Sequence, residues 1–226
     1  MDAFFKLPLS KKLALKRKPG DLCGYSGAHA NRFSSKLPWK ETFSFTYAHE
    51  HDQGLDVVDY IRSVMGEECE EAGIVYQEYC EAMKNLSFII FEILAISLGV
   101  DRFNFPRVFE DGVSIMRGNN YPPCKKAGLT FGTGPHFDPN SLTILHQDQV
   151  GGLEIYSDNK WRAIRPRPDA FVVNIGDTFV VRIYTYIYAY TFLFCVSCIL
   201  FMFEYLICDV VMTHEAVLLY CPYACM

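Results

Sequence analysis

The last 46 residues of this sequence contain no glycine, lysine, asparagine, glutamine or tryptophan. All 15 glycines of the chain lie before residue 181, and only four of these 46 residues carry a charge, whereas eleven are Tyr or Phe. Residues 1–180 have the mixed composition of an ordinary globular chain, with enough apolar residues for a core. The absences in residues 181–226 therefore exclude a simple continuation of the same domain.

The run 183–203 within this tail has no charged residue. At ~1.5 Å per residue, a helix of that length would cross the hydrocarbon core of a bilayer. Its tyrosines alternate at period 2 in "IYTYIYAY", however, and tyrosines of membrane helices gather at the interfaces. The alternation resembles translated TA-rich non-coding DNA, so we favour intron read-through or mis-annotated sequence. A membrane span and a buried pair of strands stay open as alternatives.

Further absences narrow the class of protein. The chain has no long run of basic residues and a formal net charge of −5, which argues against nucleic acid as a partner. The start, "MDAFFKLPLSKK", has no long apolar stretch and predicts no secretory signal. No CxxC pair recurs with zinc spacing, and five of the nine cysteines lie in the tail. We therefore expect free thiols in a reducing compartment, and a cytoplasmic monomer.

The first 105 residues predict helices and loops. Residues 1–16 predict a short amphipathic helix ended by Pro19 and Gly20, and residues 19–54 are loop-rich. Residues 55–66 predict a helix, and residues 69–99 predict a longer one. Apolar residues at spacings of three and four predict a core-facing stripe on the longer helix: Val75, Tyr79, Met83, Leu86, Ile90 and Ile93.

After Pro106 the pattern changes to short β-like runs separated by turn residues. The runs are "VSIMRGNNY", "SLTILHQ", "GLEIYS", "KWRAI" and "AFVVNIG". Short strands at near-regular spacing are typical of an all-β sandwich or barrel. We predict an α+β, mainly β chain: an N-terminal helical and loop region at residues 1–105, an antiparallel double sheet at residues 106–180, and the aberrant tail at residues 181–226.

A His and an Asp two positions apart, His136 and Asp138, lie in "GTGPHFDPN". At the end of an extended strand, positions i and i+2 point to the same face, so an imidazole nitrogen and a carboxylate oxygen would lie side by side. With one further His they would form the 2-His-1-carboxylate arrangement, which holds ferrous iron and leaves coordination positions open. A surface turn with a helix-capping Asp is the alternative for these two residues by themselves.

The sequence around this pair resembles the plant 2-oxoglutarate and Fe(II)-dependent dioxygenases. The stretches that carry the resemblance are "NNYPPCKKAGLTFGTGPHFDPNSLTILHQDQVGGLEIY" and "AFVVNIGDTF". The resemblance extends over residues 1–179, and "LPWKETFSF" at residues 37–45 looks most like the gibberellin 20-oxidases within that family. It implies a double-stranded β-helix (jelly-roll) core. It also implies oxidation of a gibberellin at C20, driven by decarboxylation of 2-oxoglutarate to succinate, with Fe(II) as cofactor and ascorbate as reductant.

The resemblance implies roles for six residues. These are His136 and Asp138 as iron ligands, Asn119 and Tyr121 as contacts of 2-oxoglutarate, and Trp39 and Lys40 as contacts of the gibberellin. By themselves, Tyr121 also suits a packed strand position and Trp39 an aromatic plug under a loop. His146 suits a sheet histidine with satisfied hydrogen bonds.

Two features of the family are missing. Its second His ligand should fall near residue 192, where this chain has Phe192, and an Arg-x-Ser pair for the far carboxylate of 2-oxoglutarate should follow, where the chain has residues 202–204, "MFE". His214, in "MTHEAVLL", is a late alternative for the third ligand. Relatives also carry further residues before the position of Met1. The resemblance thus implies a fragment, with a jelly-roll core incomplete at both ends.

Three functions stay open. The first is an active dioxygenase of gibberellin biosynthesis that takes a small-molecule gibberellin. The second is a non-catalytic, truncated product of such a gene. The third is a membrane-anchored binding protein that uses residues 183–203.

Overall fold

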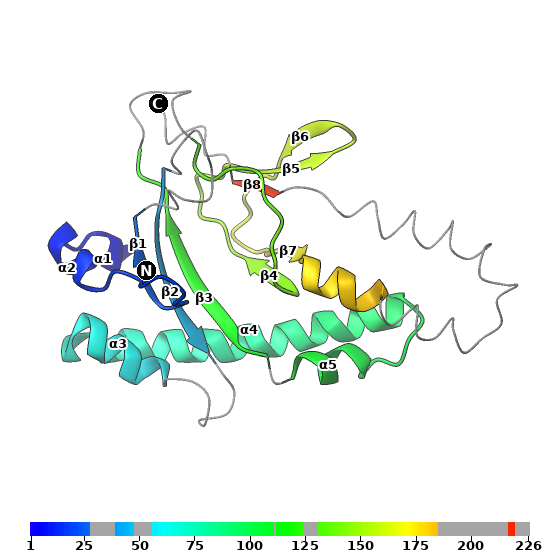
Figure 1. Ribbon diagram of the computed structural model, residues 1–226, viewed down its shortest axis with the longest axis horizontal. Helices are drawn as coiled ribbons and strands as arrows, with labels where there is room; N and C mark the ends of the chain where they lie inside the picture. Colours follow the sequence, from blue (N-terminus) through cyan, green and yellow to red (C-terminus); the bar gives the residue numbers. More distant parts are fainter. Residues whose placement is uncertain (28–38, 48–55, 111, 124–130, 185–216, 220–226) are drawn as a thin grey trace, which may run out of the picture. The chain divides into compact units, whose positions relative to one another are not determined.

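The computed structural model describes residues 1–27, 39–47, 56–110, 112–123, 131–184 and 217–219. The chain divides into two compact units, Met1–Pro122 (unit 1) and Pro123–Met226 (unit 2). Helices and strands occur in both units, so the mixed α+β class predicted from the sequence is confirmed (Figure 1). The description as mainly β was wrong for the described residues, because their helices contain more residues than their strands.

Unit 1 contains an antiparallel sheet with the order β1–β2–β3. Strand β1 spans Gly24–Ser26, β2 spans Glu41–Tyr47 and β3 spans Ser114–Asn120. The prediction that residues 19–54 are loop-rich was therefore wrong for β2. Its sequence, "ETFSFTY", alternates aromatic and hydroxyl-bearing side chains and suits a strand, but the Gly, Ser and Pro residues around it obscure that pattern.

The first helical segment is divided in two, whereas the sequence predicted one helix. Helix α1 spans Asp2–Phe5 and α2 spans Leu9–Ala14, with Pro8 at the N-cap of α2 in an extended conformation (φ −53°, ψ 142°). Proline lacks the N–H that a continuous helix needs, and it disfavours the helical conformation of the residue before it. Pro8 therefore ends one helix and begins the next.

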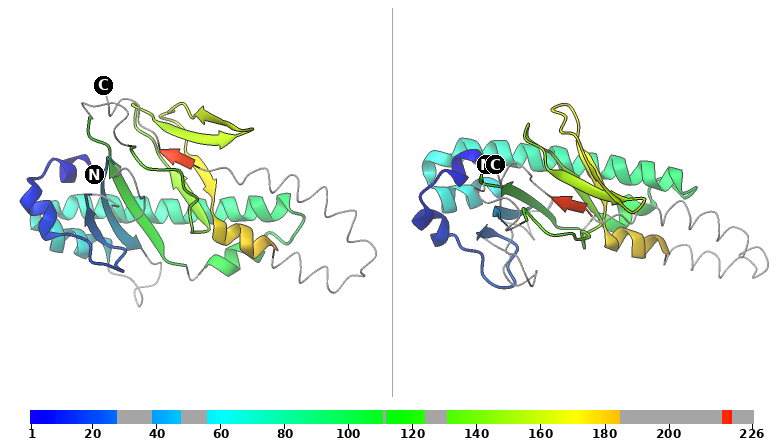
Figure 2. Two further views of the ribbon diagram at one scale, coloured as in Figure 1. Left: turned by 45° about the horizontal axis from the view of Figure 1, so that its top comes forward. Right: turned by 90° about the horizontal axis from the view of Figure 1, so that it is seen from above.

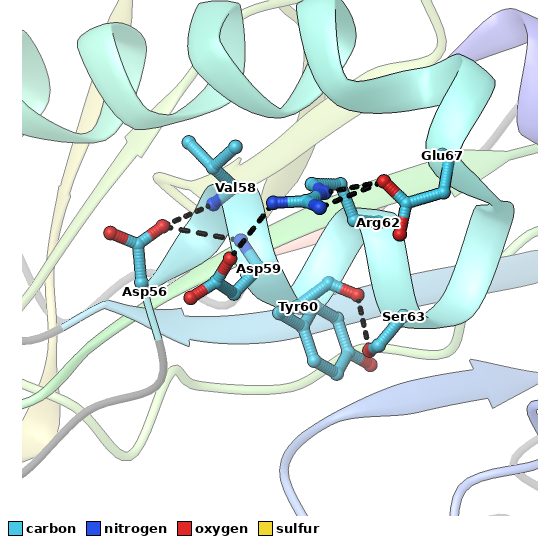
Figure 3. A network of polar contacts seen from close by, with 7 residues as sticks. All are labelled: Asp56, Val58, Asp59, Tyr60, Arg62, Ser63 and Glu67. Atoms are coloured by element: carbon cyan, nitrogen blue, oxygen red, sulfur yellow. Dashed lines mark hydrogen bonds and ion pairs between the residues drawn. The ribbon is translucent and has the colours of Figure 1, made fainter.

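Helix α3, Val57–Met65, forms where the sequence predicts it. The carboxylate of Asp56 caps its first turn by accepting hydrogen bonds from the backbone N–H groups of Val58, at 2.8 Å, and Asp59, at 3.2 Å (Figure 3). At the other end, the guanidinium of Arg62 donates two hydrogen bonds to Glu67, of 3.0 and 2.8 Å. The 3₁₀ turn η1, Glu67–Cys69, then leads into the long helix α4, Glu70–Ser97.

The buried face of α4 differs from the predicted stripe. Its buried residues are Gly73, Cys80, Lys84, Phe91 and Ala95. Within the predicted stripe, Val75 is 56% and Ile93 is 59% exposed. The stripe was wrong at these two positions, whereas its other four residues are half-buried. The buried face differs because it includes a glycine, an alanine and a lysine, which an apolar-periodicity argument does not count. The amine of Lys84 donates a hydrogen bond to the carbonyl of Gly112 at 3.0 Å, which compensates its burial.

Aromatic side chains form the core of unit 1. Phe43 and Phe45, on β2, are 0% and 1% exposed, and the ring of Phe4 stacks on Phe43 with the centroids 4.0 Å apart. Helix α3 contributes Val57 and Ile61 to the same cluster. It lies alongside the first part of α4 (Figure 2), and helix α5, Asn104–Phe109, contacts α4 as well.

Unit 2 contains two small antiparallel sheets. Strand β4, Leu142–Leu145, pairs with β7, Val172–Ile175. Strand β5 lies between β6 and β8 in the second sheet. The bounds of these three strands are Leu153–Ser157 for β5, Lys160–Ala163 for β6 and Val217–Leu219 for β8.

All five strands predicted after Pro106 are confirmed, as β3 to β7. Asp158 and Asn159 form the tight turn of the β5–β6 hairpin with φ values of 50° and 59°, as a two-residue turn requires. Next to this turn, the rings of Tyr156 and Trp161 pack with their centroids 5.0 Å apart. Residues 177–184 are helical.

Most of the tail lies outside the described residues. This holds for residues 185–203 of the charge-free run. Phe192, at the position of the missing second His, and His214, the alternative third ligand, also lie outside them. Among the described residues, no helix combines the length and hydropathy that a membrane crossing needs.

Candidate metal centre

His136 and Asp138 lie in the segment of unit 2 that leads into β4. The ring nitrogen Nε2 of His136 is 3.6 Å from Oδ1 of Asp138, and the two side chains are 26% and 23% exposed. The other ring nitrogen, Nδ1, is 2.9 Å from the carbonyl oxygen of Gly134. A carbonyl can only accept, so in the neutral ring Nδ1 carries the proton and Nε2 keeps the lone pair that a metal could accept.

This arrangement fits two ligands of a divalent metal. Metal-binding histidines typically donate their second ring N–H to a carbonyl or carboxylate, which fixes the ring, and Gly134 provides that acceptor. An imidazole nitrogen and a carboxylate oxygen also suit Fe(II) chemically. Among the described residues, no group of three or more His, Cys, Asp or Glu side chains could hold a metal. The described part of the site therefore offers two candidate ligands.

A set of four hydrogen bonds, which we call the clasp, fixes the backbone that carries Asp138. It joins residues 138–141 to residues 176–178. The N–H groups of Gly176, Asp177 and Thr178 donate to the carbonyls of Ser141, Asp138 and Asn140, at 3.1, 2.9 and 3.1 Å. The hydroxyl of Thr178 also donates to the carbonyl of Pro139 at 2.6 Å. Because β4 and β7 pair directly beside it, the clasp closes the end of that two-stranded sheet.

Gly176 is required by this close approach. A Cβ at this position would lie 2.1 Å from the carbonyl oxygen of Asn140, although its φ is not in the left-handed region. Glycine is therefore needed for space rather than for its conformational freedom.

The other four predicted residues gather in unit 1, at one end of the β2–β3 ribbon. Asn119 lies opposite Thr42 in the register, and Tyr121 follows β3 directly. Trp39 and Lys40 precede β2, and the indole Nε1 of Trp39 donates a 2.7 Å hydrogen bond to the carbonyl of Pro122. Two motifs far apart in the sequence are thus side by side.

The exposure of these residues and of His146 tests the alternative structural roles that their sequence positions allow. Trp39 is 43% exposed, which disfavours a buried plug. Asn119 is exposed and Tyr121 is half-buried. His146 lies one residue beyond β4, is exposed, and packs its ring in a T-shaped arrangement with Phe171, with the centroids 5.9 Å apart.

Sequence reasoning missed two groups of residues that support the site. Gly176 and Thr178 belong to the stretch that carried the family resemblance, but only the structure shows their bonds to residues 138–141. Glu41 lies directly after Lys40 and binds Asn120 across the ribbon. The signal for Glu41 was its place within the motif "LPWKETFSF", but its partners lie too far away in the sequence to be recognised.

Comparison with known proteins defines the class of protein. Residues 95–185 match the family model of the 2OG-Fe(II) oxygenase superfamily. Residues 1–76 match the model described as non-haem dioxygenase in morphine synthesis N-terminal. Residues 95–185 are thus assigned to the 2OG-Fe(II) oxygenase superfamily, and this assignment implies Fe(II) and 2-oxoglutarate as cofactor and cosubstrate.

The matching curated relatives are plant enzymes. The chain is 55% identical over 180 residues to gibberellin 20 oxidase 2 of Arabidopsis thaliana, an alignment that covers 80% of this chain and 48% of the relative. It is also 55% identical over 180 residues to gibberellin 20 oxidase 1-B of Triticum aestivum, covering 80% of this chain and 49% of the relative. The chain thus spans about half the length of the curated relatives it matches.

Solved structures agree with this assignment. The crystal structure of JOX2 in complex with 2OG, Fe and JA superposes with a TM-score of 0.65 at 29% identity, over 79% of this chain and 52% of that one. A 2OG-Fe(II) oxygenase family protein from Caulobacter crescentus superposes with a TM-score of 0.68 at 21% identity, over 98% of this chain and 65% of that one. At that identity the second match supports the fold only.

Proposed function

We propose that the chain derives from a gibberellin 20-oxidase and carries part of its catalytic machinery. The reaction would use O2 to oxidise a gibberellin precursor at C20 while 2-oxoglutarate is oxidatively decarboxylated to succinate and CO2, and ascorbate would keep the iron in the ferrous state. The observation that carries the proposal is the pair His136–Asp138, with Nε2 of His136 3.6 Å from Oδ1 of Asp138 and Nδ1 fixed by Gly134. The 55% identity to gibberellin 20-oxidases supports the substrate class.

The proposed site residues act by binding and orienting. His136 would bind the iron through Nε2, and the carbonyl of Gly134 keeps the ring in that tautomer. Asp138 would bind it through the carboxylate, and the clasp holds its backbone. Bound Fe(II) supplies the oxygen activation that couples cosubstrate decarboxylation to oxidation of one C–H bond.

The substrates would be held by residues of unit 1. Asn119 and Tyr121 would hold 2-oxoglutarate, and Trp39 and Lys40 would contact the gibberellin. All four lie at the same end of the β2–β3 ribbon, which supports a shared role. We propose in addition that the strands of unit 2 belong to a double-stranded β-helix, and that residues 1–105, 106–180 and 181–226 are separate parts of the chain. A cytoplasmic location and a monomeric state stay predictions.

Succinate release tests the proposal. The full chain is supplied with Fe(II), ascorbate, 2-oxoglutarate and a C20 gibberellin, and succinate is measured against the variants His136→Ala and Asp138→Ala. We expect both variants to abolish turnover, and His146→Ala, which changes an exposed histidine beyond β4, to retain it. Turnover equal to that of the wild type in the His136 and Asp138 variants would refute the assignment of the ligands.

A second candidate is an iron-binding chain without turnover. The sequence observation that favours it is Phe192, at the position where the family has its second His. In that case Fe(II) would bind through His136 and Asp138, and no succinate would form. Iron that loads at full stoichiometry through three protein side chains, with normal turnover, would exclude this candidate.

A further inference from the structure

The carboxylate of Glu41 is the centre of a polar cluster in unit 1. Its Oε1 accepts hydrogen bonds of 2.6 Å from Nζ of Lys12 and 2.6 Å from the hydroxyl of Tyr25. Its Oε2 accepts one of 3.0 Å from Nδ2 of Asn120. These donors come from α2, β1 and β3, so a single carboxylate at the start of β2 joins four elements of unit 1.

The hydrogen bonds of the cluster favour the ionised form of the Glu41 carboxyl group. Burial would by itself raise the pKa of Glu41, but the hydrogen bonds from Lys12, Tyr25 and Asn120, and the positive charge of Lys12, lower it below its usual value. Burial and the bond to Glu41 raise the pKa of Tyr25, so its hydroxyl stays a donor. Lys12 is 6% exposed, and its amine also donates to the carbonyl of Phe5 at 3.1 Å.

A buried ion pair of this kind adds little net stability over apolar side chains of similar size, since both charges must be desolvated. Its distinct contribution is geometric, because charge-assisted hydrogen bonds fix the direction of every partner. The partner with functional neighbours is Asn120, which lies in the sequence between Asn119 and Tyr121.

Side chains alternate between the two faces of a strand. Asn120 is half-buried against Glu41, whereas Asn119 is exposed. In the register of β2 and β3, Glu41 lies opposite Asn120 and Thr42 opposite Asn119. A slip of one residue would exchange the faces and turn Asn119 and Tyr121 away. The bond between Glu41 and Asn120 therefore fixes which face of β3 carries Asn119.

We propose that Glu41 is a positioning residue, which holds the end of β3 through Asn120 so that Asn119 and Tyr121 are presented to 2-oxoglutarate. The inference rests on the proposed function, because it takes the cosubstrate role of these two residues from it. The hydrogen bond from Trp39 to the carbonyl of Pro122 is a second link across that end of the ribbon and also holds the end of β3 in place.

Two matched variants test the proposal on the full chain. Asn120→Leu removes the bond to Oε2, and Tyr25→Phe removes one of the bonds to Oε1, each with little change in side-chain size. Loss of one hydrogen bond that orients a ligand group weakens binding by about tenfold. We expect Asn120→Leu to weaken 2-oxoglutarate binding to the Fe(II)-loaded chain by about that factor in anaerobic calorimetry, and Tyr25→Phe to leave it unchanged.

Affinity for Fe(II), measured on each variant without 2-oxoglutarate, provides the second readout. Positioning through Asn120 predicts that Fe(II) affinity does not change, because His136 and Asp138 are untouched. Glu41→Gln is the direct variant, but it leaves the buried amine of Lys12 without a counterion and would destabilise unit 1. The positioning role is therefore tested with Asn120→Leu and Tyr25→Phe.

The outcomes separate the two proposals. If the wild-type chain binds Fe(II) but no 2-oxoglutarate, the cosubstrate part of the proposed function fails, and the role of Glu41 fails with it. If the wild type binds 2-oxoglutarate and Asn120→Leu binds it equally well, the positioning role fails and the proposed function stands. Equal losses in Asn120→Leu and Tyr25→Phe would show that the cluster supports folding only, which also overturns the positioning role.

Discussion

Replacing Gly176 by alanine should disrupt the backbone that carries Asp138. The added Cβ would lie 2.1 Å from the carbonyl oxygen of Asn140 and 2.6 Å from its side-chain Oδ1, whereas real Cβ atoms essentially never come within 3.0 Å of such atoms. The Asn140 backbone must therefore withdraw by 0.9 Å, the difference between 3.0 and 2.1 Å. This obstacle is backbone, which cannot rotate away as the end of a side chain can.

The size of the effect follows from the bonds that such a movement breaks. The N–H of Thr178 donates to the carbonyl of Asn140, and that of Gly176 donates to Ser141. Each lost bond costs about 0.5–1.5 kcal/mol, and the overpacking itself costs about 1–3 kcal/mol. The free energy of unfolding of unit 2 should therefore fall by about 2–6 kcal/mol. Affinity for a divalent metal should fall with it, because Asp138 loses its support.

Native-state hydrogen exchange on the full chain measures the effect where it occurs. The amides of Asp177 and Thr178 donate across the clasp, so Gly176→Ala should speed their exchange strongly. Gly27→Ala is the matched control in unit 1, because its nearest heavy atom is the hydroxyl of the Tyr25 side chain, at 3.3 Å. Unchanged exchange at Asp177 and Thr178, together with unchanged Mn(II) affinity, would refute the steric reasoning.

Three further predictions concern unit 1, with urea unfolding as the measurement. Asp56→Ala removes the cap of α3 and should lower stability by about 1 kcal/mol, whereas Asp56→Asn should retain most of it. Phe43→Ala should cost about 3–5 kcal/mol because Phe43 is fully buried, and a smaller loss would mean that the core refills the space. The third prediction concerns pH. The folded pKa of Glu41 is lowered, so the stability it contributes is complete above its unfolded pKa of about 4.3 and is lost as the pH falls through the folded value. Glu41→Gln should flatten this acid dependence, and an equally steep profile in the variant would contradict the assignment.

The strands that sequence alone predicted are short β-like runs flanked by turn residues. Strands β3 to β7 meet this condition, and the Asp158–Asn159 turn marks one of their boundaries. Strand β2 has the right residues but lies in loop-like surroundings. Its burial depends on Phe4 and on helix α3, which are distant contacts that a local pattern does not contain.

Helix α4 shows a second limit. Periodicity located the helix, but the buried face passes through Gly73, where a Cβ would meet the Cα of Val58 at 2.9 Å. That face was set by the close approach of α3, and hydrophobicity does not report backbone proximity. The same face also contains Lys84, whose burial is compensated because the carbonyl of Gly112 accepts a hydrogen bond from its amine.

In the candidate site, too, the local pattern could be predicted from the sequence and the long-range contacts could not. His136 and Asp138 were predicted as ligands from their spacing and from the family resemblance, and the structure adds the orientation of the ring through Gly134. The links that hold the site join residues far apart in the chain: Thr178 to Pro139, and Glu41 to Asn120. Such pairs follow from the fold, so no single sequence pattern contains them.

The chain has two tryptophans, and each unit contains one: Trp39 in unit 1 and Trp161 in unit 2. Trp39 is 43% and Trp161 is 41% exposed, so the emission of both should respond to solvent and to nearby quenchers. Trp161→Phe would leave Trp39, itself a proposed gibberellin contact, as the fluorophore, and Trp39→Phe would leave Trp161 on the β5–β6 hairpin. Fluorescence from the two variants would report melting and ligand titration of each half of the molecule separately, without any attached label.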